Sequence, residues 1–154
     1  MRCVFGVLIF VLAIASLTFA QESQPAAWSS HRAVAGHLSD ALVASQYGLA
    51  AWDAWKSDRR ADEFKQLGCR TIAVLGIVEP LKHLTHRLRP DGSDRLSFPS
   101  GHTANAISQS GWNYQISIPI AIGAGYMRAA ANKHYASDIA VGAAVGLIAQ
   151  RVCR

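Results

Sequence analysis

The chain has 154 residues, which is the size of one domain, and a formal net charge of +5 at pH 7. Charges of opposite sign are mixed along it, and the basic stretch "KSDRR" is followed at once by "ADEFK". No basic stripe with interleaved aromatic residues occurs, which argues against nucleic acid as a partner. We therefore expect the excess positive charge to act locally, around an anionic ligand.

Residues 1–20 are predicted to be a secretory signal peptide. Arg2 precedes an apolar run from Val4 to Phe19, and Thr18 and Ala20 offer small residues to a signal peptidase. The run is short for a bilayer span of about 20 residues, which favours cleavage after Ala20 over an uncleaved anchor in the inner membrane. We expect an exported, periplasmic protein whose domain comprises residues 21–154.

The cysteines agree with export. Cys3 leaves with the signal peptide, and Cys69 and Cys153 remain as an even pair in an oxidising compartment. A disulfide between them is predicted. Two buried thiols are the alternative, because sequence alone does not show how closely the two Cα atoms approach.

Helical patterns fill most of the domain, since small and apolar residues recur at intervals of three and four and no period-2 strand pattern of useful length occurs. Pro80 is expected to kink or restart the second helix, and a loop rich in Pro and Gly follows that helix. The fold class is predicted to be all-α, a compact bundle of about five helices with the site at one end. The predicted helices are 31–55, 61–88, 102–112, 115–131 and 135–151, and the loop is 89–101.

The last two helices are apolar and contain many small residues. Gly142 and Gly146 are four apart and on one helix face, which allows a neighbouring helix to approach closely. A tightly packed helical core is the prediction, and association with a membrane surface is the alternative. A domain of this size also leaves a homodimer open.

The stretch "SFPSGHT" (97–103) raises the question of function. Ser100 is predicted to cap the helix that follows, and the free N–H groups of a helix N-terminus bind anions. Gly101 allows a ligand to approach the backbone, and His102 then stands beside the anion.

Two further stretches supply charge. Lys82 and Arg89 are seven apart, so we expect them on one side of a helix. His134 and Asp138 are four apart, so a carboxylate is expected to reach the imidazole on one helix face, with Arg128 just upstream. Cations, histidines, a carboxylate and an anion-binding turn are the groups that phosphoryl transfer through a histidine requires.

These motifs resemble the three-part signature of the type 2 phosphatidic acid phosphatase superfamily, which includes bacterial acid phosphatases and vanadium haloperoxidases. Ten residues match in order and spacing between Lys82 and Asp138. Two features depart from the usual pattern. Met127 stands where the family usually has Ser, and only eight residues separate Pro90 from Pro99, as in compact bacterial members.

The resemblance implies a phosphatase that needs no metal and no cofactor and acts on a phosphorylated small molecule or lipid. His134 would be the nucleophile and form a phosphohistidine, Asp138 would hold its other ring nitrogen, and His102 would protonate the leaving group. The phosphate-binding residues would be Lys82, Arg89, Ser100, Gly101 and Arg128.

Two alternatives of other kinds stay open. One is a haloperoxidase that binds vanadate in the same pocket, and the other is a non-catalytic helical envelope protein. His83 and His86 are three apart and could share a metal ion, but no third ligand stands at a suitable spacing, so no metal site is predicted.

Overall fold

Five helices, and no strand, make up residues 29–154, the part of the chain that the computed structural model describes. The predicted signal peptide lies outside these residues. In chain order the helices are α2 (Ser29–Lys56), α3 (Arg60–Thr85), α4 (Gly101–Ser108), α5 (Tyr114–Ala130) and α6 (Ala136–Val152). The predicted all-α class is confirmed, and a loop joins the second and third of these helices as predicted, although it starts three residues earlier than expected.

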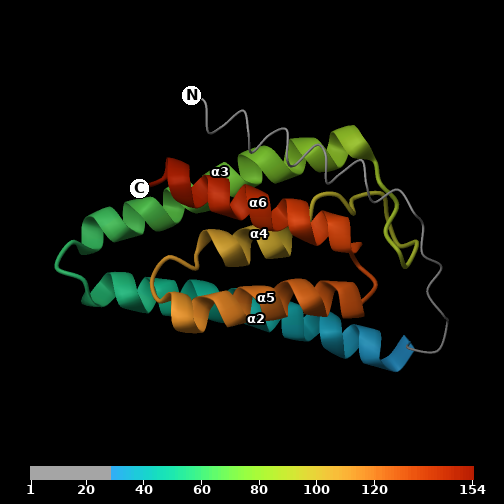
Figure 1. The fold of residues 1–154 in the computed structure, drawn as a ribbon, viewed down its shortest axis with the longest axis horizontal. Coiled ribbons are helices and arrows are strands. Elements are labelled where there is room, and N and C mark those ends of the chain that lie inside the picture. The colour runs from blue at the N-terminus through green and yellow to red at the C-terminus, as the bar shows by residue number, and fades with distance from the viewer. Residues whose placement is uncertain (1–28) are drawn as a thin grey trace.

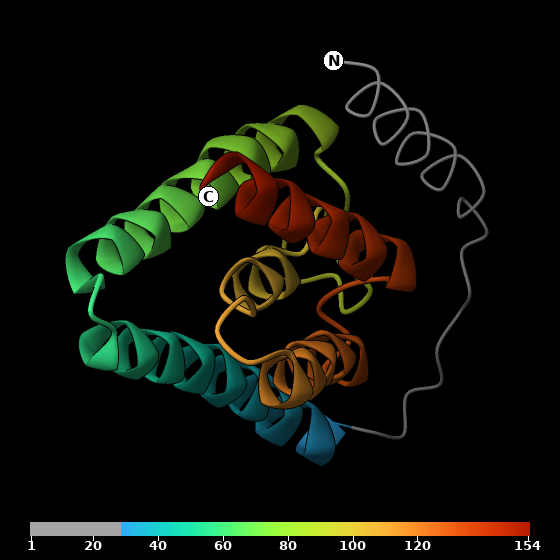
Figure 2. The ribbon, with the colours of Figure 1, turned by 60° about the vertical axis from the view of Figure 1, so that its left-hand side comes forward.

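The short helix α4 lies at the centre of the bundle. Seen nearly end-on in Figure 2, it is surrounded by the four longer helices. In Figure 1, α2 and α5 lie side by side below it and α3 and α6 lie above. Because α4 touches every other helix, residues at its N-terminus can meet side chains from all of them.

Two helices end earlier than the sequence pattern predicts. At the end of α3, His86 adopts the left-handed conformation (φ 45°) and its N–H bonds to the carbonyl of Lys82, so the helix stops at Thr85. At the end of α4, Ser110 turns back to Ile107, and its carbonyl accepts a hydrogen bond from Ser117. Continuation of α4 to residue 112 was therefore a wrong prediction. In α3 the helix runs through Pro80, so a restart there is also excluded.

The core consists of two clusters of small side chains, and α4 contributes residues to both. One cluster joins Val74 and Val78 of α3 to Ala104 and to the buried face of α6, and a second joins Ala106 and Ile107 to α5, with Leu42 and Val43 of α2 against it. Because Ala and Val dominate both clusters, the helices pack closely. None of the helices in residues 29–154 has both the length and the apolar character that a membrane span needs.

The two glycines of α6 mark the closest helix contact. A Cβ atom built on Gly142 would collide with the carbonyl oxygen of Ser100, and one built on Gly146 would lie 2.6 Å from the carbonyl oxygen of Ala104. No side chain fits at either position. The predicted close approach at these two glycines is confirmed, and it seats α6 against the first turns of α4.

A disulfide links α3 to the residue that follows α6, at the end of the bundle away from the N-terminus of α4. Cys69 of α3 and Cys153, just after α6, are bonded across 84 positions with their Cα atoms 5.7 Å apart. The predicted pairing is confirmed.

Candidate active site

The three motif stretches meet at one end of the bundle, beside the N-terminus of α4 (Figure 1). The end of α3, the loop 86–100, the end of α5 and the start of α6 all reach this region. The loop 86–100 is attached to the α5–α6 connection, where the Asp91 N–H donates to the carbonyl of Asn132 and the Asp91 carboxylate lies 2.6 Å from Lys133 Nζ. Two segments without helical structure thereby hold each other in place.

His134 is nearly buried, with 2% of its side chain exposed. Its Nδ1 atom lies 2.6 Å from the carbonyl oxygen of Ser97. A carbonyl oxygen can only accept a hydrogen bond, so Nδ1 carries the proton. In the neutral ring, Nε2 then holds the lone pair, so Nε2 is the ring atom that can attack an electrophile.

Asp138 is fully buried and has three donors around it. Its Oδ2 accepts from Ser97 Oγ at 2.5 Å and from the Tyr135 N–H at 3.0 Å, and its Oδ1 accepts from Arg87 at 2.7 Å. The distance from Oδ2 to His134 Nδ1 is 3.8 Å. The sequence predicts that Asp138 bonds this ring nitrogen directly. In the structure the Ser97 carbonyl accepts that bond, and Asp138 instead accepts a hydrogen bond from the Ser97 hydroxyl. The reason is that α6 begins only at Ala136, so His134 is not on its face.

Three cations of the site each face a carboxylate, and their side chains are only 11–17% exposed. The three carboxylates that they face, called the rim carboxylates below, are about half exposed. The pairs are Lys82–Glu79 at 2.9 Å, Arg89–Asp94 at 2.7 Å and Arg128–Asp40 at 3.6 Å. Arg128 also has a buried Nε without a partner among the described residues. The cations are therefore held in place and still have donors for an anion.

Arg89 reaches the site from the loop and not from α3. The prediction that Lys82 and Arg89 share a helix face was wrong, because α3 ends at Thr85. Instead, Arg89 donates to Asp94 and, at 3.3 Å, to the carbonyl of Lys133, next to His134. Although burial raises the pKa of Asp94, hydrogen bonds from Arg89 and the Leu96 N–H outweigh it and leave that pKa below its usual value.

Ser100 caps α4 as predicted. Its side chain accepts from the Thr103 N–H, and its own N–H donates to the carbonyl of Asp138. The Ser100 hydroxyl is fully buried and bonded to Thr103 Oγ1, so it serves the helix in this structure, and its contact with phosphate stays a prediction. Gly101 and His102 occupy the first two helical positions, whose N–H groups have no partner within a helix.

Gly101 and His102 connect the cap to the charged groups. A Cβ atom built on Gly101 would lie 3.7 Å from Lys82 Nζ, so the lysine passes close to this backbone. His102 Nε2 lies 2.7 Å from Oδ1 of Asp40, which comes from the middle of α2. About a third of the His102 side chain is exposed, in contrast to His134.

Burial lowers the pKa of both histidines below the usual value. For His102 the charge of Arg128 lowers the pKa further, while Asp40 opposes both effects. For His134 the charges of Arg89 and Arg128 act in the same direction as burial, while the nearby Asp138 carboxylate and the hydrogen bond to the Ser97 carbonyl act against them. The neutral form of His134 is thereby favoured near neutral pH.

Three residues of the site have no counterpart among the predicted ones: Asp40, Arg87 and Ser97. Arg87 also stacks over the ring of Tyr135, 4.2 Å from its centroid. Arg87 and Ser97 lie within two or three residues of motif positions, and this nearness in sequence is a weak signal for a place in the site. Asp40 lies in a helix far from every motif, and no sequence signal marked it.

No group of three or more His, Cys, Asp or Glu side chains suited to a metal ion occurs in residues 29–154. His83, near the end of α3, and His86, just after it, are both exposed.

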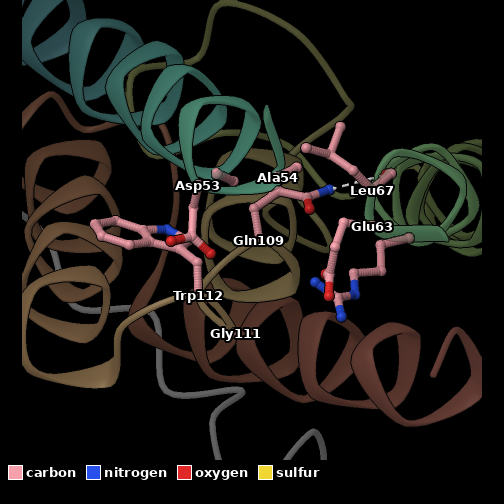
Figure 3. A pocket seen from close by; sticks show the side chains of 9 residues that line it. Asp53, Ala54, Glu63, Leu67, Gln109, Gly111 and Trp112 are labelled. Atoms are coloured by element: carbon pink, nitrogen blue, oxygen red, sulfur yellow. Dashed lines mark hydrogen bonds between the residues drawn. The ribbon is translucent and has the colours of Figure 1, made fainter. Parts of the chain in front are cut away.

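A separate hollow of about 140 Å³ lies at the opposite end of the bundle (Figure 3). Its lining contains three buried polar atoms without partners among the described residues, namely Arg70 Nε, Gln109 Oε1 and Trp112 Nε1. Its size and mixed polarity suit a few water molecules, each of which needs two to four polar partners. It shares no residue with the histidine site.

The chain is similar, over part of its length, to a curated phosphatase. It is 39% identical over 84 residues to the lipid A 1-phosphatase of Porphyromonas gingivalis, which corresponds to 47% of this chain and 19% of that protein. The chain therefore matches about a fifth of the length of this relative. No family model matches the chain, and no solved structure matches it.

Proposed function

We propose that the protein is a phosphatase that hydrolyses a phosphomonoester or pyrophosphate through a phosphohistidine on His134. The observation that carries the proposal is the hydrogen bond from His134 Nδ1 to the Ser97 carbonyl. It leaves the Nε2 lone pair of the neutral ring available. Arg89 and Arg128 lie close enough for their charges to lower the pKa of His134. Similarity to a curated phosphatase supports the same reaction class.

The reaction would proceed in two steps. His134 Nε2 forms a bond to phosphorus as the bond to the leaving oxygen breaks, and His102 gives its proton to that oxygen. A water molecule then attacks phosphorus as the bond between phosphorus and Nε2 breaks, His102 takes a proton from that water, and phosphate leaves. Arg89, Arg128 and Lys82 would stabilise the charge on the phosphoryl oxygens, which is the main task of the protein in phosphoryl transfer.

A lipid phosphate is the substrate class that we favour. The name of the relative points to a lipid, and an apolar stripe along α2 suits the surface of a membrane. Val34 and Trp52 are 18 residues apart, which is five full turns, and with Leu38 and Leu49 they form one exposed face. Trp52 carries Lys56 at 4.8 Å from its ring centroid, a pairing suited to the headgroup region.

The test is phosphate release by the mature protein, with EDTA present, from three substrates. These are lipid A in mixed micelles, an isoprenoid pyrophosphate and p-nitrophenyl phosphate, each with His134→Ala as the control. Release of phosphate that depends on His134 supports the proposal, and the preferred substrate identifies the class. Equal rates for the protein and the His134→Ala variant on all three substrates would refute it.

A further inference from the structure

We infer that Asp40 is a positioning residue for His102: its carboxylate selects which ring nitrogen faces the substrate and favours the protonated form of the ring. The inference rests on the proposed function, because it assigns Asp40 a part in the same reaction. Its basis is the 2.7 Å contact between Asp40 Oδ1 and His102 Nε2, made across 62 positions of the chain.

Asp40 differs from the other rim carboxylates. Glu79 and Asp94 each face one cation, whereas Oδ1 of Asp40 faces both His102 and, at 3.6 Å, Nη1 of Arg128. It therefore contacts two of the groups that the reaction would use. A carboxylate that served only to balance Arg128 would not need to lie closer to the histidine than to the arginine.

The contact determines the chemistry of the ring. An ionised carboxylate can only accept, so Nε2 of His102 carries a proton that it donates to Asp40. The proton passed to a leaving group must then come from Nδ1. When His102 has given up that proton, the same Nδ1 lone pair can take a proton from water.

The charges around His102 oppose one another. Arg128 from α5, Lys82 from α3, which passes close to the Gly101 backbone, and His134 from the α5–α6 connection all carry or can acquire positive charge. Asp40 is the carboxylate that bonds the ring, and it acts against the burial and the Arg128 charge that lower the pKa of His102. Without Asp40, a smaller fraction of His102 would be protonated at neutral pH.

The fold holds Asp40 in this position. The neighbouring Ser39 is fully buried, and its hydroxyl donates to the carbonyl of Ala124 at 3.0 Å. Ala124 lies one helical turn before Arg128 on α5. The hydrogen bond therefore fixes α2 against α5 at the level where the Asp40 carboxylate reaches both Arg128 and His102.

The test compares Asp40→Asn with Glu79→Gln, which removes the same charge from the rim without touching His102. The pKa of His102 is measured by NMR, with its signal assigned as the one missing in His102→Gln. We expect Asp40→Asn to lower this pKa and Glu79→Gln to leave it unchanged. An unchanged pKa in Asp40→Asn overturns the inference, whatever the activity, so its failure is distinct from that of the proposed function.

Kinetics give the second measurement. Asp40→Asn should reduce kcat about 10- to 100-fold for an alkyl phosphate, within what general acid catalysis supplies, and much less for p-nitrophenyl phosphate, whose leaving group needs little protonation. Asp40→Glu should restore part of the loss. If Asp40 were only a counter-ion of Arg128, both substrates would change by the same factor, mainly through KM, and that result would overturn the inference.

Discussion

His134 Nδ1 lies 2.6 Å from the carbonyl oxygen of Ser97 and 3.8 Å from the Asp138 carboxylate. The backbone thus fixes the imidazole, and Asp138 fixes that backbone through the Ser97 hydroxyl. The sequence assigns to the Asp138 carboxylate both the charge near the ring and the acceptor for its N–H, whereas in the structure two residues fill these roles. Asp138 supplies negative charge near the ring, and Ser97 supplies the acceptor.

This division makes a prediction for Asp138→Asn. The Nδ1–H tautomer of His134 should persist in the variant, because its acceptor is the Ser97 carbonyl. Stability should fall by about 1–3 kcal/mol, because Arg87 loses a charged, buried partner. Nitrogen chemical shifts of the imidazole and urea unfolding measure the two effects. Loss of the tautomer with unchanged stability would show that Asp138 orients the ring directly.

Removal of His134 and removal of His102 should affect different steps of the reaction. His134→Ala should abolish phosphoenzyme formation, because it removes the proposed nucleophile. His102→Ala should cost about 10²–10⁴ in rate with an ordinary leaving group and much less with nitrophenolate. Acid-labile, base-stable phosphate on trapped protein, mapped by mass spectrometry, checks this. Phosphate found on His102 would reverse the roles.

The pH optimum of the activity should lie below the usual pKa of a histidine side chain. His102 must be protonated to act as the acid, and burial and Arg128 lower its pKa below 6.5. Activity on an alkyl phosphate should therefore decline as the pH rises through a value under 6.5. On the acid side it should decline again as His134, whose pKa is also lowered by burial, takes up a proton. An alkaline limb above pH 7 would contradict this assignment.

How far the sequence predicts this site depends on how local each contact is. The Ser100 cap follows from residues within a single turn, so the pattern "PSGH" predicts it correctly. The Ser97 carbonyl is a group that every residue has, and no letter in the sequence marks it as the acceptor. Asp40 and His102 are joined only by tertiary packing, and no spacing rule connects them.

The fold was predictable for the same reason. Helical periodicity is a local property, and it locates the five helices of residues 29–154, whereas helix ends depend on single residues such as His86 in a left-handed conformation. Those ends matter for the site. Because α3 stops at Thr85 and α6 starts at Ala136, Arg89 and His134 lie in loops that tertiary hydrogen bonds hold.

Gly146→Ala tests the contact between α6 and α4. In an exposed helix this substitution would stabilise by about 1 kcal/mol, because Ala is the better helix former. Here the added Cβ would lie 2.6 Å from the Ala104 carbonyl oxygen and 2.8 Å from Ile107 Cβ. The variant should therefore lose about 1–3 kcal/mol, the usual cost of overpacking. Gly36→Ala is the matched control, since nothing lies within 4 Å of its added Cβ. Equal stability of both variants in urea unfolding would mean that α6 can move away at no cost.

Cys69–Cys153 closes a loop across 84 positions, and restraint of the unfolded chain by a loop of this length is worth about 4–5 kcal/mol in the chain-entropy model. Reduction should lower the free energy of unfolding by up to that amount, and a Cys69→Ser, Cys153→Ser double variant should be insensitive to the reductant.

The same cysteines report on export, because Cys3 belongs to the predicted signal peptide. Protein from the periplasm, labelled under denaturing and non-reducing conditions, should show no free thiol. One labelled cysteine would mean that the N-terminal segment is retained, two that the disulfide is absent after cleavage, and three that both expectations fail. The count thus separates a cleaved, oxidised protein from an anchored or reduced one in a single measurement.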